Sequence, residues 1–279
     1  MMRHLSMLLL CLVVGCQKVI DLDLRRVQKR LVVNGTITDS PGPYTISLSH
    51  TTTYSFKDSS DFISGVTGAK VWMEDNLGNT ENLPEWQPGL YRTDSTGHFQ
   101  GVAGRSYALH IITPEGKHYA SLPELLQPVA TIDSIYYKYN ATEGAKGQYT
   151  VSIDMLDPPG KGNYYRWNFF INGTYLIEIH VDSDNFFDGS PLKGKVVGGW
   201  SQPQDSMLVE VQQMSLSKDA YDFWRLVDVQ YRQQSNAPYD TPPAPILGNV
   251  YNLNDPNDYA LGYFGASGMT HKKIWLRNK

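Results

Sequence analysis

The segment SYALHIITPEGKHYAS, residues 106–121, decides the fold class because it reads as two strands joined by a turn. Apolar and polar side chains alternate on both sides of Pro114 and Gly116, as they do in half-buried strands around a turn. Upstream segments with the same character, each bounded by turn residues, are 31–35, 44–49, 69–75 and 89–93. This spacing predicts a β-sandwich over residues 31–122.

The composition supports a mainly β protein. Aromatic residues make up 12% of the chain and charged residues only 19%, with 24 glycines and 16 prolines for turns. The order of an apolar strand, an Asp-turn-Gly, Gly-x-Tyr and Tyr-x-Leu-x-Ile resembles that of prealbumin-like and carboxypeptidase-regulatory-like sandwiches. The N-terminal domain is therefore expected to be prealbumin-like or Ig-like.

A second β domain is predicted over residues 128–279. Pro123 and Pro128 interrupt the alternation, which indicates a linker or a domain seam between them. Strand-like segments then resume, and we identify 132–139, 149–154, 164–171, 175–180 and 207–211. The chain is thus predicted to form two β-sandwich-like domains.

One segment of the second domain, residues 216–232, has helical periodicity instead. Its apolar face is predicted to consist of Ala220, Phe223, Trp224, Val227 and Tyr231. Ser217 is placed to cap the first turn, while Asp219 and Arg232 suit the two ends of the helix dipole. We expect an amphipathic helix that lies across the second sheet, with its aromatic pair in the core rather than forming a binding platform.

The first sixteen residues are typical of an export signal. Arg3 precedes an apolar run, Leu5–Val14, that is too short to span a bilayer. Val13-Val14-Gly15-Cys16 resembles a bacterial lipobox, so residues 1–15 are predicted to be a signal peptide and Cys16 the site of lipid attachment. The alternative is an ordinary secretory peptide, but cleavage before Cys16 also removes Cys11 and leaves no free thiol.

Residues 16–30 are then a lipid tether, and the lipid is the expected membrane contact. Gln17-Lys18 lacks the aspartate that retains many lipoproteins at the inner membrane, which favours the outer membrane and leaves open the periplasmic or the surface face. Nucleic acid is not an expected partner, because the formal net charge is −4.

A search for catalytic motifs gives a largely negative result. The sequence contains no Gly-x-Ser-x-Gly, no His-Glu-x-x-His and no phosphate-binding glycine loop after a strand. The histidines show no ligand-like spacing, and His110 and His180 are expected to be structural. We therefore predict no cofactor and no catalytic residue.

Two weaker candidate sites are present. In the loop DSDNFFDG, residues 182–189, the carboxylates of Asp182, Asp184 and Asp188 could wrap calcium, although Phe186 stands where another oxygen ligand belongs. A solvated turn is the favoured interpretation. Trp200, in a turn-rich stretch, is a candidate for stacking on a sugar, against the favoured alternative that the aromatic residues fill the cores.

Short motifs spread along the chain suggest a family. These are IDLD (20–23), LVVNG (31–35) with ITD (37–39), GPY (42–44) with Leu48-Ser49, PVATIDSI (128–135), Leu216-Ser217 with Phe223-Trp224, and APILGN (244–249) with LGYF (261–264). Together they resemble a Bacteroidetes lipoprotein family catalogued as a domain of unknown function, number four-two-four-nine. Members are typically encoded beside TonB-dependent receptors, so the resemblance implies an accessory role in capture or uptake and no assigned activity.

Two hypotheses follow for the function. The favoured one is a non-enzymatic accessory lipoprotein that docks on a TonB-dependent receptor and presents a ligand. The alternative is a surface hydrolase or a carbohydrate-binding protein acting on a glycan or peptide. As a hydrolase it would use paired carboxylates from Asp182, Asp184, Asp188 and Glu178.

Overall fold

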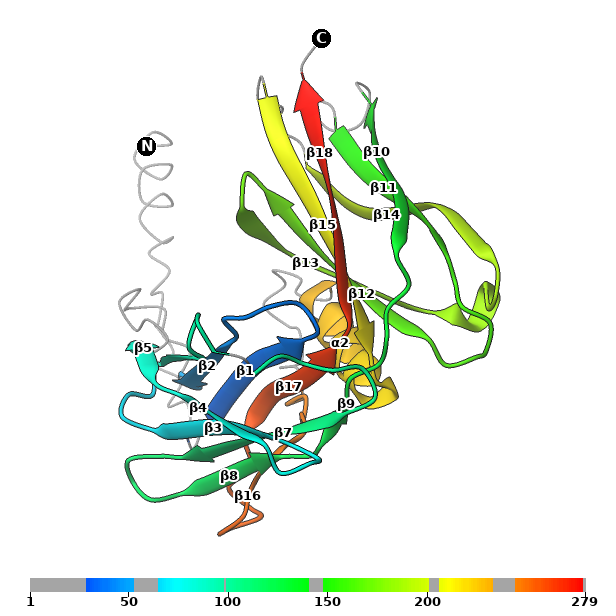
Figure 1. Ribbon diagram of the computed structural model, residues 1–279. Coiled ribbons are helices and arrows are strands. Elements are labelled where there is room, and N and C mark those ends of the chain that lie inside the picture. Colours follow the sequence, from blue (N-terminus) through cyan, green and yellow to red (C-terminus); the bar gives the residue numbers. More distant parts are fainter. Residues whose placement is uncertain are drawn as a thin grey trace, which may run out of the picture.

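The computed structural model describes residues 29–52, 65–97, 99–140, 148–200, 206–232 and 244–277. Within these residues the chain is built mainly of β-strands, with one α-helix (Figure 1), which confirms the predicted fold class. The predicted signal peptide, Cys16 and residues 17–28 of the tether lie outside the described residues. No helix in the described part of the chain is long and apolar enough to cross a membrane.

Two sheets form an N-terminal sandwich. One sheet has the strand order β17-β1-β2-β6-β5, and the other has the order β16-β8-β7-β3-β4, with β9 also paired with β7. The strands are β1 (Leu31–Thr38), β2 (Thr45–His50), β3 (Lys70–Asp75), β4 (Thr80–Leu83), β5 (Glu85–Gln87), β6 (Leu90–Arg92), β7 (Ser106–Ile112), β8 (His118–Ser121), β9 (Glu124–Leu125), β16 (Val250–Asn252) and β17 (Leu261–Ser267).

The alternation of side chains along β7 shows why these strands form. Tyr107, Leu109 and Ile111 are buried, while the residues between them are half-buried on the other face of the sheet. Val33 and Ile37 of β1 belong to the same core cluster, so this core fills the space between the two sheets. The hairpin of β7 and β8 is paired as the sequence predicts, with His110 opposite Ala120.

A second sandwich is formed by the sheets β10-β11-β14 and β13-β12-β15-β18. Its elements are β10 (Ile132–Asn140), β11 (Gln148–Leu156), β12 (Tyr164–Ile171), β13 (Thr174–Ser183), the 3-10 turn η2 (Asp184–Phe186), β14 (Pro191–Trp200), β15 (Ser206–Leu216) and β18 (Met269–Arg277). Trp167 of β12 lies fully buried in its core, and its indole Nε1 donates a hydrogen bond of 2.8 Å to Gln213 Oε1.

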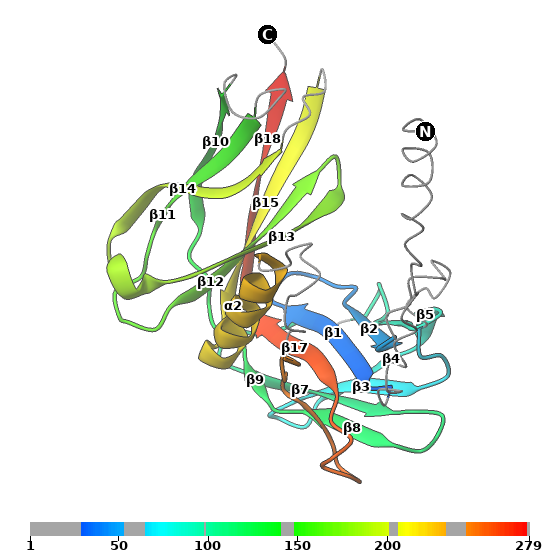
Figure 2. The same cartoon turned by 180° about the vertical axis from the view of Figure 1, so that it is seen from behind.

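Helix α2 (Lys218–Arg232) covers the outer face of the second sandwich near its junction with the first (Figures 1 and 2). Ala220 and Phe223 are buried, and Phe223 packs on Tyr263 of β17 with ring centroids 5.0 Å apart. The predicted helix is confirmed, and so is its aromatic contact with the core. Tyr231 differs from the prediction because it is 49% exposed, one turn beyond the part of the helix that the sheet covers.

The cap of α2 provides a stability prediction. Ser217 Oγ accepts a hydrogen bond of 3.0 Å from the Ala220 N–H, as expected of an N-cap. We expect Ser217→Ala to lower the free energy of unfolding by about 1–2 kcal/mol, whereas Ser217→Thr retains most of it. Urea denaturation of the purified full chain measures both. Equal midpoints for the alanine variant and the wild type would contradict the role of the cap.

The C-terminal part of the chain does not form one domain as predicted for 128–279. Residues 250–267 return to the N-terminal sandwich, where β17 pairs in parallel with β1 and β16 pairs with β8 (Figure 1). The physical reason is that a parallel strand can pair with one far away in sequence, and local alternation carries no information on that partner. The first domain therefore combines 31–126 with a late segment, and the second is inserted between them.

The segment between Pro123 and Pro128 is a seam rather than a free linker. It contains β9, its Glu124 side chain is buried, and Leu126 is fully buried in the first core. The returning chain crosses the same seam at Gly268, the one residue between β17 and β18. Its N–H bonds to Gln127 O at 3.0 Å and to Ser215 Oγ at 2.8 Å, so the two sandwiches are joined by backbone hydrogen bonds.

Candidate functional site

Two of the predicted acidic residues are engaged in separate ion pairs on the second sandwich. Asp182 Oδ2 accepts a very short hydrogen bond from Lys195 Nζ of strand β14. Glu178 Oε2 lies 2.9 Å from His180 Nε2 on the same strand, β13. Each of these two carboxylates is therefore held by a partner of its own.

The other two predicted residues, Asp184 and Asp188, do come together, and Asp157 joins them. A carboxylate oxygen of each lies within 4.8 Å of the others. The predicted solvated turn holds for Phe186, which is 98% exposed, but not for Asp184, which is fully buried beside the equally buried Asp157. We refer to Asp157, Asp184 and Asp188 as the acidic cluster.

A pocket of about 330 Å³ opens at the edge of the second sandwich, a size within the usual range for small-molecule sites. It lies where the edge strands β13 and β14 meet the C-terminal end of α2. We call it the edge pocket, and its lining residues are Gln148, Thr150, Glu178, Ile179, His180, Val196, Gly198, Gly199, Asp228, Tyr231 and Arg232.

The edge pocket contains groups of both charge signs. The pair Glu178 and His180 comes from β13, while Arg232 Nε at the end of α2 lies 2.7 Å from Asp228 Oδ1. Arg232 Nη2 also donates to Ile179 O at 3.5 Å, which links the helix end to the strand. Such a set of donors and acceptors suits a small polar or zwitterionic molecule.

The walls of the edge pocket follow from the local sequence of β14. Val196 is 50% exposed and faces the pocket, whereas its neighbour Val197 is fully buried in the core. A Cβ at Gly198 would stand 2.7 Å from the ring of Phe169, so glycine lets the strand lie directly on the core. The lining residues in the described part of the chain include no serine and no cysteine, the usual nucleophiles of covalent hydrolases.

The ring of Trp200 packs against core residues rather than projecting into solvent. Its ring stacks on Tyr149 with centroids 5.1 Å apart and an interplanar angle of 10°, and it approaches Phe169 at 5.7 Å. Trp275, at 61% exposure, is far more open to solvent. The predicted sugar platform at Trp200 therefore has little free ring surface, in agreement with the alternative that the aromatic residues fill the cores.

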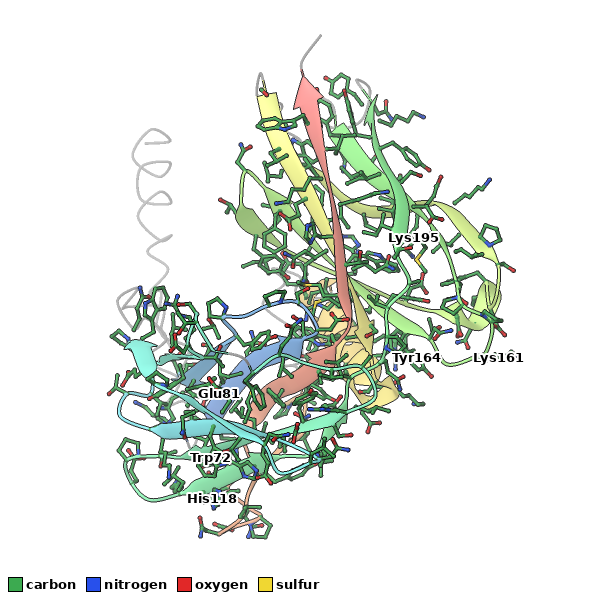
Figure 3. The ribbon with its side chains drawn as sticks, in the orientation of Figure 1. Trp72, Glu81, His118, Lys161, Tyr164 and Lys195 are labelled. Atoms are coloured by element: carbon green, nitrogen blue, oxygen red, sulfur yellow. The ribbon has the colours of Figure 1, made fainter. Side chains whose placement is uncertain are left out.

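The histidines that we expected to be structural have packing partners. His110 stacks on Trp72 with ring centroids 4.9 Å apart and lies 6.0 Å from His118. Figure 3 shows Trp72 and His118 on the same side of the N-terminal sandwich. Burial lowers the pKa of His110, although Glu74 acts in the opposite direction. The lowered pKa keeps the ring neutral near pH 7.

Comparison with protein families adds one finding. The family model described as "Domain of unknown function (DUF4249)" matches residues 17–273, nearly the whole chain. The chain belongs to this family. The predicted resemblance is thereby confirmed for the domain itself.

Other comparisons of this DUF4249 protein are less informative. No curated protein sequence matches it. Among solved structures, a segment of two fibronectin type III domains from chicken tenascin is 15% identical and covers 68% of this chain and 91% of the tenascin chain. The TM-score is 0.18, so this likeness carries no argument about the arrangement or the function of the DUF4249 protein.

Proposed function

We propose that this DUF4249 protein is a non-enzymatic, lipid-anchored accessory of a TonB-dependent uptake system in the outer membrane, and that it presents a small polar ligand in the edge pocket. The observation that carries the proposal is the pocket itself: it combines Glu178, His180, Asp228 and Arg232 on the rim of a rigid sandwich, without a serine or cysteine among its described lining residues. Its donors and acceptors of both charge signs are suited to binding a small polar molecule.

The contacts of Arg30, where the predicted tether meets the first sandwich, support the proposed lipid anchoring. Arg30, the last residue of the predicted tether, stacks over the ring of Tyr259 at 3.6 Å and donates to Asn257 O at 3.1 Å. Arg30 is thus fixed to the N-terminal sandwich, while the edge pocket belongs to the other sandwich. Anchoring through Cys16 would leave the pocket on the unit that does not receive the tether.

The hydrolase alternative finds less support in the geometry. Its clustered carboxylates are Asp157, Asp184 and Asp188, and two of these three are buried out of reach of a glycan or peptide. Asp182 is held by the Lys195 ammonium, and Glu178 Oε2 lies 2.9 Å from His180 Nε2. The carbohydrate-binding alternative likewise loses Trp200 as an exposed platform.

The decisive experiment is extraction of the tagged full-length protein from its native outer membrane in mild detergent, followed by mass spectrometry of what stays bound. A stoichiometric TonB-dependent receptor is the expected result. A Cys16→Ala variant serves as the control, since it removes the predicted lipid and should leave the membrane fraction. Isolation of the wild type alone, in repeated preparations, would rule out the accessory role.

Filling the edge pocket should abolish retention of its ligand. Val196 is half exposed, so Val196→Arg is expected to change the free energy of unfolding by no more than about 0.5 kcal/mol while it obstructs the pocket. Native mass spectrometry of protein purified from its own cells should show a small molecule on the wild type and not on the variant. Leu77→Arg, at a turn residue that is 64% exposed, is the matched control and should retain it. Equal retention by both variants would place the ligand elsewhere.

A further inference from the structure

Two connections at one end of the second sandwich bring the acidic cluster together. Residues 157–163 join β11 to β12, and residues 184–190 join β13 to β14. The first connection supplies Asp157 and the second supplies Asp184 and Asp188. Figure 3 labels Lys161 on the first of these loops, at the end of the sandwich that lies away from β18's terminus.

Backbone donors fix the carboxylates of the acidic cluster in place. Asp184 Oδ2 accepts hydrogen bonds from the Gly162 N–H at 2.8 Å and the Asn163 N–H at 3.0 Å. Asp188 Oδ1 accepts one from the Gly160 N–H at 2.7 Å. Each carboxylate of the second loop is therefore positioned by the backbone of the first.

The reverse also holds, because Asp157 is positioned by the second loop and by the core. Its Oδ2 accepts a hydrogen bond of 3.0 Å from the Gly189 N–H. Its Oδ1 accepts one of 2.5 Å from the hydroxyl of Tyr165, which is buried in the core. The acidic cluster is thus built with fixed geometry before any ligand arrives.

These hydrogen bonds leave one buried carboxylate oxygen without a partner and supply no cation. Asp184 is fully buried, and its Oδ1 has no hydrogen-bond partner among the residues that the structure describes. In the same part of the chain, no lysine, arginine or histidine forms an ion pair with any of the three carboxylates. Buried charges in proteins are normally paired or bound to a metal, because an isolated one is strongly unfavourable.

We propose that Asp157, Asp184 and Asp188 bind one calcium ion. Carboxylate oxygens are the preferred ligands of hard cations, and calcium accepts six to eight oxygens in flexible geometry, so backbone carbonyls and water complete the shell. Magnesium requires a near-ideal octahedron, and zinc prefers nitrogen and sulfur. Asp188, which is only half-buried, gives the ion its path from solvent.

This set of ligands differs from the one that the sequence first suggests. Asp182 is held by Lys195 and takes no part, while Asp157 enters from a strand end 27 residues before Asp184. The site in the structure therefore contains Asp157, whereas the site suggested by the alternating aspartates in the sequence contains Asp182. Variants of these residues distinguish the two sites.

Terbium luminescence of the full-length chain, stripped of metal by a chelator, tests the proposal. Tyr165 bonds directly to Asp157 and stacks near Trp167 at 5.9 Å, so both rings can sensitise a terbium ion bound in the cluster. We expect sensitised emission that calcium displaces. Calcium at about a hundred times its Kd should also raise Tm by roughly 5–10 °C.

Aspartate-to-asparagine variants test which carboxylates bind the ion. Asp184→Asn is expected to weaken terbium binding at least about ten-fold, because it removes one of three charged ligands. Asp182→Asn is the matched control and should bind as the wild type does. If Asp184→Asn does not fold, Asp188→Asn at the half-buried position replaces it.

The proposal fails if the wild type gives no calcium-displaceable emission and no calcium-dependent Tm, which would mean that protons alone neutralise the cluster. It also fails if Asp182→Asn loses terbium while Asp184→Asn and Asp188→Asn retain it. These measurements need neither a receptor nor a ligand of the edge pocket, so their outcome is independent of the proposed function.

Discussion

Replacement of Trp167 by alanine is expected to lower the free energy of unfolding by about 3–5 kcal/mol, the range for truncating a large buried aromatic side chain. Trp167 is fully buried between the sheets of the second sandwich. Its loss also leaves Gln213, itself buried, without the partner of its Oε1. Gln213 Nε2 donates to Ala130 O at 2.6 Å, so the damage should extend to the strand that follows the seam.

Urea denaturation followed by circular dichroism is the suitable measurement, since the substitution removes a fluorophore. Trp275→Ala is the matched control, because the same truncation at a 61% exposed residue should change the free energy of unfolding by no more than about 0.5 kcal/mol. Similar losses in the two variants would contradict the assignment of Trp167 to the core of the sandwich.

The second large effect is expected at Glu124, at the seam between the sandwiches. Its carboxylate accepts hydrogen bonds from the Tyr263 hydroxyl at 2.5 Å, from Ser217 Oγ at 2.7 Å and from Asn249 Nδ2 at 3.3 Å. Glu124→Ala should lower the free energy of unfolding by about 2–4 kcal/mol, because it leaves several buried donors without an acceptor. Thermal and urea unfolding of the full chain measure the loss.

The same residue gives a pH dependence with a definite sign. Burial raises the pKa of Glu124 above its ordinary value, in opposition to the hydrogen bonds that it accepts. A group whose pKa is raised by folding contributes stability that is fully present below its unfolded pKa and is lost as the pH rises through the folded value. Glu124→Gln lacks this titration and retains an acceptor for Tyr263.

The difference in unfolding free energy, wild type minus Glu124→Gln, should therefore become less favourable to the wild type as the pH rises from the ordinary pKa of a glutamate, near 4.5, through the raised value. Taking the difference cancels the titration of the other carboxyl groups. A difference that stays constant with pH, or that favours the wild type more at higher pH, would contradict the burial of Glu124 in the seam.

Local patterns in the sequence were sufficient to predict the strands that have one buried face. The alternation in 106–112 and 149–154 marks β7 and β11 because each has one polar and one apolar side. The helix was predictable from its period and its cap at Ser217. The strand β14 was not, since Gly198 and Gly199 near its end read as a turn, while in the structure Gly198 packs directly on the ring of Phe169.

Long-range pairing and the candidate sites depend on information that no local window contains. Asp184 and Asp188 stand in one loop and could be found, but Asp157 joins them only because two strand connections meet at one end of the sandwich. Asp182 stands two residues before Asp184 and belongs to the same sequence pattern, yet its carboxylate is paired with Lys195 of β14, in the other sheet. The edge pocket likewise forms from β11, β13, β14 and the end of α2, and the contact of these four elements cannot be predicted from any local stretch of sequence.

The parallel pairing of β1 with β17 constrains the biogenesis of the protein. Val32 lies opposite Leu261, so the first sandwich lacks an edge strand until almost the whole chain has been delivered. Contacts at such sequence separation form slowly, and during that time β1 presents an open edge to other chains. Closure also requires glycine at position 262, where a Cβ would meet Val33 O at 1.9 Å. A chain that emerges N-terminus first must therefore keep its first-made strands from aggregating until its last-made strands arrive.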